Sequence, residues 1–214
     1  MNVTKKVILI TAGDPASIST EITIKAIETK KLNENINVVV VTSLNLVQEY
    51  KSLFTSNLKI HQIKDKINFT DYKDGCINII PIKLEKNVKF GKPDLKNYSF
   101  VKCSIVTSIE IYKNSIACAI VTNPISKYVM HKSGFNFEGH TDFLASLSIK
   151  KKIPIMMLVT NELKTLPLTI HVPLKMVPKL ITKDLIHTKI KNSQIKSNCI
   201  CITTRIRFEI MCIK

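Results

Sequence analysis

Two histidines lie in short motifs that could carry chemistry. His140 belongs to the segment GHTD at 139–142, where glycine allows close approach of the backbone and the imidazole and hydroxyl can hydrogen-bond a polar substrate. His171 belongs to TIHVP at 169–173 and follows an apolar run, a position suited to a metal ligand. Zinc and related metals need three or more protein donors, so neither histidine alone defines a metal site.

A lysine follows another apolar run. Lys127 ends the segment TNPISK at 122–127, and its ammonium group could pair with a carboxylate or a phosphate. The alternative is an ordinary surface lysine, because lysine is abundant throughout this chain.

A glycine turn near the N-terminus is the fourth candidate. Gly13 permits a tight turn in TAGDPASISTE at 11–21, and the helix expected next could offer N–H groups to an anion. The segment is not GxGxxG, so it is a weak dinucleotide-binding signal. The alternative is a simple helix start with Ser19 or Thr20 as its cap.

The elements that must position these residues alternate between strands and helices. Apolar runs predict strands at 7–11, 37–42, 76–82, 115–122, 155–159 and 166–170, and helical spacing predicts helices at 18–27, 43–53, 100–113 and 177–186. Fully apolar strands between helices indicate an α/β fold with parallel pairing. Ligands of such sheets bind beyond the carboxyl ends of the strands, where the four motifs lie.

In order and spacing, these motifs resemble the 4-hydroxythreonine-4-phosphate dehydrogenase family of pyridoxal phosphate biosynthesis. The similar stretches are ITAGDPASISTE, VTNPISKYVMHKSGFNFEGHTDFLA and LTIHVPLKMVPKLIT, and the resemblance covers about residues 5–186. It implies a two-lobed architecture like that of isocitrate dehydrogenase, with parallel or mixed sheets, incomplete at the C-terminus. We expect a first lobe over 1–132, a partial second lobe over 133–186, and a tail over 187–214 without a family counterpart. That tail is either an ordinary variable segment or the product of a shifted reading frame.

The resemblance also implies roles for individual residues. His140 and Thr141 match the substrate-binding pair, His171 matches the first metal ligand, and Lys127 is expected to act catalytically near the substrate. The implied reaction is oxidation of a hydroxyl group of a phosphorylated small molecule by NAD or NADP, followed by decarboxylation. A divalent metal (Zn, Mg or Co) would act as Lewis acid, in a homodimer. The cofactor-binding residues stay unassigned.

Several departures from the family pattern bear on activity. Gly13, Asp14 and Glu21 match the family's N-terminal turn, but Ser17 and Ser19 replace glycines there and predict strain wherever positive φ is needed. Thr20 stands where the family has proline. The motifs with the second and third metal histidines and the later phosphate-holding residues do not occur in the sequence. We therefore expect a truncated and inactive homologue; the alternative is a non-catalytic protein that retains a phosphometabolite-binding pocket.

Composition excludes several other classes. The formal charge is +16, yet of 32 basic residues only Arg205 and Arg207 are arginine, and tryptophan is absent. Specific nucleic-acid binding favours arginine and stacking aromatics, so a nucleic-acid partner would rest on charge alone. No apolar run approaches the ~20 residues that span a bilayer, and the N-terminus does not read as a signal peptide. Six cysteines without a CxxC pair suggest reduced thiols and a cytoplasmic protein.

Overall fold

The strands of the molecule form where the sequence is most apolar. The computed structural model describes residues 5–29, 35–85, 88–148, 154–159, 164–170, 172–193 and 200–203. The strands are β1 (Lys6–Thr11), β2 (Ile36–Thr42), β3 (Lys59–Gln62), β4 (Cys76–Pro81), β5 (Ala117–Thr122), β6 (Leu158–Val159), β7 (Lys164–Thr165) and β8 (Ile200–Thr203). The helices are α1 (Ser19–Glu28), α2 (Leu44–Leu53), α3 (Asn97–Asn114), α4 (Lys127–Lys132), α5 (His140–Ser146), α6 (Val177–Leu180) and α7 (Lys183–Ser193), with a 3₁₀ turn η1 (Leu174–Met176).

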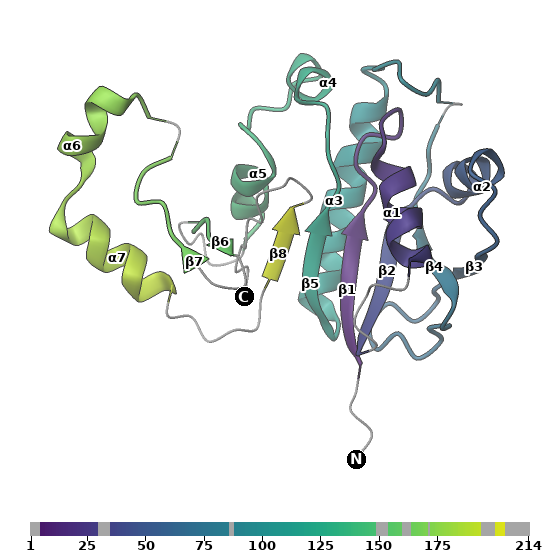
Figure 1. Cartoon of the computed structure of the whole chain (residues 1–214). Coiled ribbons are helices and arrows are strands. Elements are labelled where there is room, and N and C mark those ends of the chain that lie inside the picture. Colours follow the sequence, from purple (N-terminus) through teal and green to yellow (C-terminus); the bar gives the residue numbers. More distant parts are fainter. Residues whose placement is uncertain are drawn as a thin grey trace.

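A six-stranded sheet forms the body of the molecule, in the order β3-β4-β2-β1-β5-β8 (Figure 1). Every pairing in it is parallel. Leu9 of β1 pairs with Val39 of β2 on one side and with Ile120 of β5 on the other, and all three side chains are buried. The α/β fold with a parallel sheet, predicted from the continuous apolar runs, is confirmed.

The helices cover both faces of this sheet. The connection from β1 through α1 to β2 runs one way along the sheet, and the connection from β4 through α3 to β5 runs the other way. Because such crossovers are right-handed, α1 and α3 lie on opposite faces (Figure 1). The direction reverses between β1 and β5, and this reversal is where ligands of open α/β sheets bind.

The part of the chain after residue 154 differs from the sequence-based expectation. β6 and β7 are antiparallel strands of two residues each. Of the strand predicted at 155–159, only Leu158 and Val159 pair with a neighbouring strand. The prediction of a strand at 166–170 is wrong, because pairing stops at Thr165. The helix predicted at 177–186 is divided into α6 and α7. The Thr182 hydroxyl lies between them, where it accepts the Leu185 N–H at 3.1 Å and caps the start of α7.

The C-terminal segment contributes one strand to the main sheet. β8 pairs in parallel with β5, in the register Ala119↔Ile200 to Thr122↔Thr203. This strand lies within the tail predicted over 187–214 and was not expected from the sequence.

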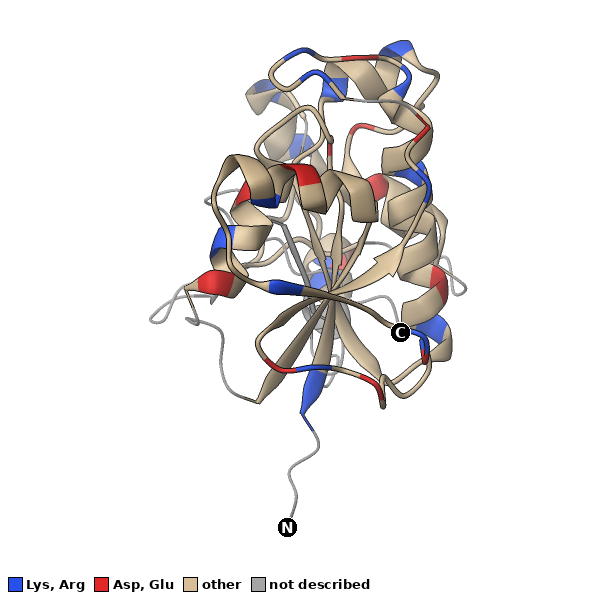
Figure 2. Cartoon of the chain, turned by 90° about the vertical axis from the view of Figure 1, so that its right-hand side faces the viewer, with Lys and Arg blue, Asp and Glu red and all other residues tan. Residues whose placement is uncertain are grey.

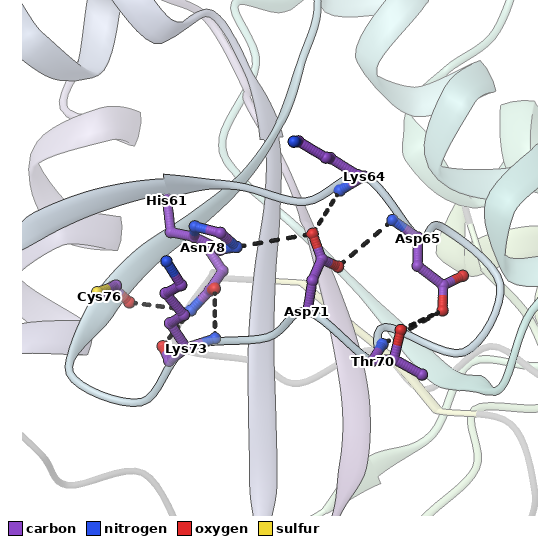
Figure 3. A network of polar contacts seen from close by, with 8 residues as sticks. All are labelled: His61, Lys64, Asp65, Thr70, Asp71, Lys73, Cys76 and Asn78. Atoms are coloured by element: carbon purple, nitrogen blue, oxygen red, sulfur yellow. Dashed lines mark hydrogen bonds and ion pairs between the residues drawn. The ribbon is translucent and has the colours of Figure 1, made fainter.

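The loop between β3 and β4 is organised by two carboxylates (Figure 3). Asp65 accepts hydrogen bonds from the backbone of Ile67, Asn68 and Thr70 and from the Thr70 hydroxyl, and these bonds lower its pKa to about 2. Asp71 accepts from the backbone N–H groups of Lys64 and Asp65. This network explains an ordered loop without needing a ligand.

Charged residues of both signs are scattered along the chain (Figure 2). Basic and acidic positions both occur on the helices and loops in that view, as expected for solvated faces. Among the described residues, no helix is long and apolar enough to cross a membrane.

Candidate active site

The turn after β1 requires glycine for two reasons. Gly13 has φ +70°, a region that other residues rarely adopt. A Cβ atom there would lie 2.5 Å from the Ser19 hydroxyl, 2.6 Å from the Pro124 carbonyl and 2.7 Å from the Asn123 Cβ. The turn therefore presses directly against the loop that follows β5.

The loop after β5 is fastened to that turn by buried hydrogen bonds. The Asn123 amide donates to the Thr11 carbonyl at 2.8 Å and to the Thr23 hydroxyl at 2.7 Å. The Pro124 carbonyl accepts from the Asp14 N–H at 3.0 Å and from the Ser19 hydroxyl at 2.9 Å. The motifs at 11–21 and 122–127 thus form one unit at the reversal between β1 and β5.

The two serines that replace family glycines close this unit without strain. Neither Ser17 nor Ser19 has positive φ, so the predicted backbone strain is absent at both. Their hydroxyls are 2.8 Å apart, and Ser17 also donates to the Asp14 carbonyl at 2.9 Å. Ser19 is the first residue of α1 and neither it nor Thr20 caps the helix, which corrects that alternative. The Ser19 N–H is also used internally, because it donates to the Ser17 hydroxyl at 3.3 Å.

Asp14 is a buried acid beside this unit. It is only 3% exposed, and its carboxylate accepts the Ala16 N–H at 3.0 Å. Burial raises the pKa of Asp14, and the hydrogen bond from Ala16 and the nearby Asn97 amide offset part of that rise. The Asn97 nitrogen is buried beside this carboxylate.

Lys127 begins α4 immediately after this unit. The Ser126 hydroxyl caps the helix by accepting the Val129 N–H at 3.3 Å, which fixes where α4 starts. Val129 and Met130 are buried and anchor the helix, while Lys127 is exposed. The lysine is therefore held at its backbone and free at its charged end.

His140 begins α5 and lies within electrostatic reach of Lys127. Its Nε2 atom is buried without a hydrogen bond, although the ring as a whole is only half-buried. Burial, and secondarily the Lys127 charge, lower the pKa of His140 to about 4, so the imidazole is neutral at neutral pH. Thr141 follows in the same helix turn and is half-buried. The structure thus brings Lys127 and His140 together from two separate motifs.

Two contacts hold α5 in place. The Lys113 ammonium, at the end of α3, donates to the Leu147 carbonyl at the C-terminus of α5 over 2.7 Å. Phe143 of α5 packs against Phe135 and Phe137, with ring centroids 5.1 Å away in both cases. These contacts orient the helix that carries His140.

Comparison with known proteins bears on this arrangement. The model of the family "Pyridoxal phosphate biosynthetic protein PdxA" matches residues 34–207. The chain belongs to this family. A 4-hydroxythreonine-4-phosphate dehydrogenase of Sulfurihydrogenibium sp. is 34% identical over 182 residues, which is 85% of this chain and 55% of the relative. One from Wigglesworthia glossinidia brevipalpis is 32% identical over 183 residues, which is 86% and 54%.

Solved structures agree with the PdxA assignment. A crystal structure of the dehydrogenase from Klebsiella pneumoniae has a TM-score of 0.78 at 26% identity, covering 88% of this chain and 58% of that one. A terephthalate dihydrodiol dehydrogenase from Burkholderia xenovorans shares the fold alone, with a TM-score of 0.63 at 14% identity. The chain thus spans little more than half the length of these relatives. The PdxA family model also extends to 207, beyond the predicted boundary at 187.

The metal ligand expected in a PdxA protein is not brought into the described site. His171 lies outside the described residues. Among the described residues, no three His, Cys, Asp or Glu side chains gather closely enough to hold a metal. The described part of the chain therefore does not fit a metal centre, and no reaction step is derived through one.

Asn97, Asn123 and Lys113 were not singled out in the sequence. Asn123 was quoted only as part of a turn, and its amide proves to join two motifs that are about a hundred positions apart. Its signal was available, since an Asn-Pro pair directly after an apolar strand marks a turn that must be fastened. Nothing in the sequence places Asn97 beside Asp14 or Lys113 beside Leu147.

Proposed function

We propose that this PdxA homologue binds a phosphorylated hydroxy-amino acid of the 4-hydroxythreonine 4-phosphate type through Lys127, His140 and Thr141, and does not turn it over on its own. The observation that carries the proposal is that Lys127 and His140 are the first residues of α4 and α5, near enough for the lysine charge to lower the pKa of the imidazole. The names of the relatives supply the substrate class.

A cationic Lys127 and a neutral His140 suit an anionic substrate that carries a hydroxyl group. The exposed Lys127 ammonium would pair with a carboxylate or phosphate. The neutral imidazole of His140 would hydrogen-bond the hydroxyl group through Nε2, which has no partner among the described residues. Thr141 would add a second hydroxyl contact. A protonated His140 would carry a charge and would have no ring nitrogen left to accept a hydrogen bond. Burial keeps the ring neutral and therefore favours the proposed contact with the hydroxyl group.

The proposed lack of turnover rests on the metal donors found within these 214 residues. The family's oxidation needs NAD or NADP as hydride acceptor and a divalent metal (Zn, Mg or Co) as Lewis acid. The sequence has one of the three expected metal histidines, His171, and one donor holds such a metal weakly. A homodimer of the family kind would repeat the same gap in both copies. Lys127 as a catalytic residue, the cytoplasmic location and the domain boundaries stay predictions.

Two measurements test the proposal. NAD(P)H formation from 4-phosphooxy-threonine with added Zn²⁺ or Mg²⁺ should stay at background, and a rate within about tenfold of a full-length relative would refute the lack of turnover. Calorimetric titration with the same compound should show binding that weakens about tenfold in Lys127→Gln. Lys132→Gln, on the same helix, is the matched control and should bind as the unaltered chain does.

The calorimetry also tests the binding part of the proposal separately from the lack of turnover. The buried, neutral His140 favours binding, because its Nε2 atom has no hydrogen-bond partner among the described residues and a bound ligand would supply one. Binding at micromolar concentration without turnover would support it. No heat at millimolar ligand would discard the proposed binding and leave an inactive homologue.

A further inference from the structure

Two serine hydroxyls join the turn after β1 to the loop that leads into α4. The Ser19 hydroxyl donates to the Pro124 carbonyl at 2.9 Å. The Ser17 hydroxyl lies 2.8 Å from the Ser19 oxygen and 2.9 Å from the Asp14 carbonyl. Each hydroxyl has one proton, so the Ser17 proton is shared between the Ser19 oxygen and the Asp14 carbonyl. Ser17 and Ser19 are here called the serine clasp.

The turn that carries the serine clasp is fixed to the body of the molecule. The Tyr50 hydroxyl, from α2, donates to the Ser17 carbonyl at 2.6 Å. Tyr50 is buried, and its ring meets that of Phe90 edge to face with the centroids 4.5 Å apart. The Gly91 N–H donates to the Ala16 carbonyl at 2.8 Å. Donors from two other segments thus hold consecutive carbonyl groups of the turn, so the turn is held in place independently of the loop after β5.

The loop after β5 is attached to the clasp at a single carbonyl group. The Pro124 carbonyl accepts the Asp14 N–H at 3.0 Å and the Ser19 hydroxyl, and these two bonds use both of its lone pairs. Ser19 is completely buried, so water does not reach its hydroxyl. A hydrogen bond shielded from water is electrostatically stronger than an exposed one, and it restrains the loop accordingly.

The restrained carbonyl lies three residues before Lys127. The chain passes from Pro124 directly into α4, where the Ser126 carbonyl accepts the Met130 N–H at 3.0 Å. The Lys127 side chain is exposed, so its position depends chiefly on the backbone that leads into the helix. A displacement of Pro124 would therefore move the start of α4 and, with it, the charge that acts on His140.

The clasp depends on hydroxyl groups that the family pattern lacks. That pattern has glycine in place of Ser17 and Ser19, and glycine has no side chain that could donate to Pro124. We propose that the serine clasp positions Lys127 relative to His140 by fastening the loop after β5 to the turn after β1. This inference rests on the proposed function, because it assigns two positioning residues to the same binding site.

Ser19→Ala in the full chain tests the proposal, because it removes the hydroxyl and keeps the Cβ. The Met130 amide should exchange with deuterium about tenfold faster, since the start of α4 opens more often. In an NMR titration, the pKa of the His140 imidazole should rise from about 4 toward its ordinary value of 6.5, because the Lys127 charge is held less closely.

Ser108→Ala is the matched control. Ser108 is also completely buried, and its hydroxyl donates to a carbonyl group of α3 at 2.7 Å. This substitution should change neither measurement. Tyr50→Phe releases the Ser17 carbonyl on the other side of the clasp and should change both measurements in the same direction as Ser19→Ala. It replaces Ser19→Ala as the test if that variant does not fold.

Equal changes in Ser19→Ala and Ser108→Ala would overturn the proposal, because they would reflect a general loss of stability. Faster exchange in α4 with an unchanged imidazole pKa would overturn it too, since the clasp would then stabilise α4 without positioning Lys127. Unchanged exchange would have the same force.

Neither measurement needs a ligand, so the serine clasp and the proposed function can fail separately. If 4-phosphooxy-threonine does not bind the unaltered chain, the proposed function fails, and exchange and titration still decide whether the clasp positions Lys127. If the unaltered chain binds it, Ser19→Ala should weaken the affinity about threefold to tenfold, and equal affinity would overturn the proposal.

Discussion

The sheet body and the segment after residue 154 bury their apolar side chains to very different extents. Leu9, Val39 and Ile79 of the sheet are completely buried. Leu174, in the later segment, is 85% exposed, and its neighbours there that are also exposed are Val172, Met176, Leu180 and Ile181. Both regions are rich in apolar residues, so composition does not separate them. What separates them is that a parallel sheet with helices on both faces encloses its strands, whereas β6, β7 and the helical elements from Leu174 to Ser193 do not.

Truncation of one leucine in each region is the strongest test of this contrast. Leu9→Ala should lower the free energy of unfolding by about 3–5 kcal/mol, because it leaves a cavity in a closed core. Leu174→Ala should change it by less than about 0.5 kcal/mol, because that side chain is already in solvent. Chemical denaturation of both variants measures the difference. Equal losses would show that the later segment belongs to the same core.

Within the body, the turn after β1 should tolerate less change than other glycine turns. Gly13→Ala should cost about 3 kcal/mol, since it adds a Cβ clash to an unfavourable φ. Gly75 is the matched control: its φ is +72°, and nothing lies within 4 Å of its Cβ position. Gly75→Ala should cost only about 1 kcal/mol by denaturation. If the two substitutions cost the same, the tight contact with the loop after β5 contributes nothing to stability.

The edge of the body that carries His140 should show a pH signature. The pKa of His140 is about 4 in the folded protein and 6.5 ordinarily, so the unfolded chain binds more protons between these values. The free energy of unfolding should therefore fall as the pH drops from 6.5 to about 4, by about 2 kcal/mol after allowance for the half-buried ring. His140→Gln should remove this part of the pH dependence. NMR titration of the imidazole gives the folded pKa directly, and a value near 6.5 would contradict the burial of Nε2.

The smallest expected effect concerns the anchoring of α5 to the body. Lys113→Met removes the hydrogen bond to the Leu147 carbonyl and should cost about 1 kcal/mol. Hydrogen exchange should speed up at the amides of α5 and stay unchanged in β1. Lys132→Met, on the exposed face of α4, is the control and should alter neither. Uniform acceleration across the sheet in Lys113→Met would mean that α5 unfolds only with the whole body.

Elements of the body were predictable because their patterns are strong. β1, β2, β4 and β5 are nearly continuous apolar runs, and each begins within two residues of its predicted start. β3 was missed because its sequence, KIHQ, is mostly polar at the sheet edge. The strand predicted at 166–170 failed for the opposite reason: an apolar run is not enough where no neighbouring strand is available to pair.

Motifs in the sequence predicted which residues form the candidate site, but they did not predict how these residues lie relative to one another. His140, Thr141 and Lys127 were singled out individually, but their mutual position depends on α4 and α5, neither of which was expected. The expectation that serines at 17 and 19 strain the turn failed because neither has positive φ, and the Ser19 hydroxyl bonds to the Pro124 carbonyl in the loop after β5. Such compensation involves residues about a hundred positions away and leaves no local signature. His171 cannot be judged in the same way, since it lies outside the described residues.

The central place of β1 has a consequence for how the chain is made. Val7 pairs with Ala117, 110 positions later, so the ribosome must add all of that chain before the sheet can close. At about 5–20 residues per second, β1 waits roughly 5–20 s for this neighbour. During that interval its apolar edge is paired on one side only, by β2, and the nascent chain is open to chaperones or to other copies. Synthesis speed over the stretch between β4 and β5 should therefore control the yield of folded protein more than speed elsewhere.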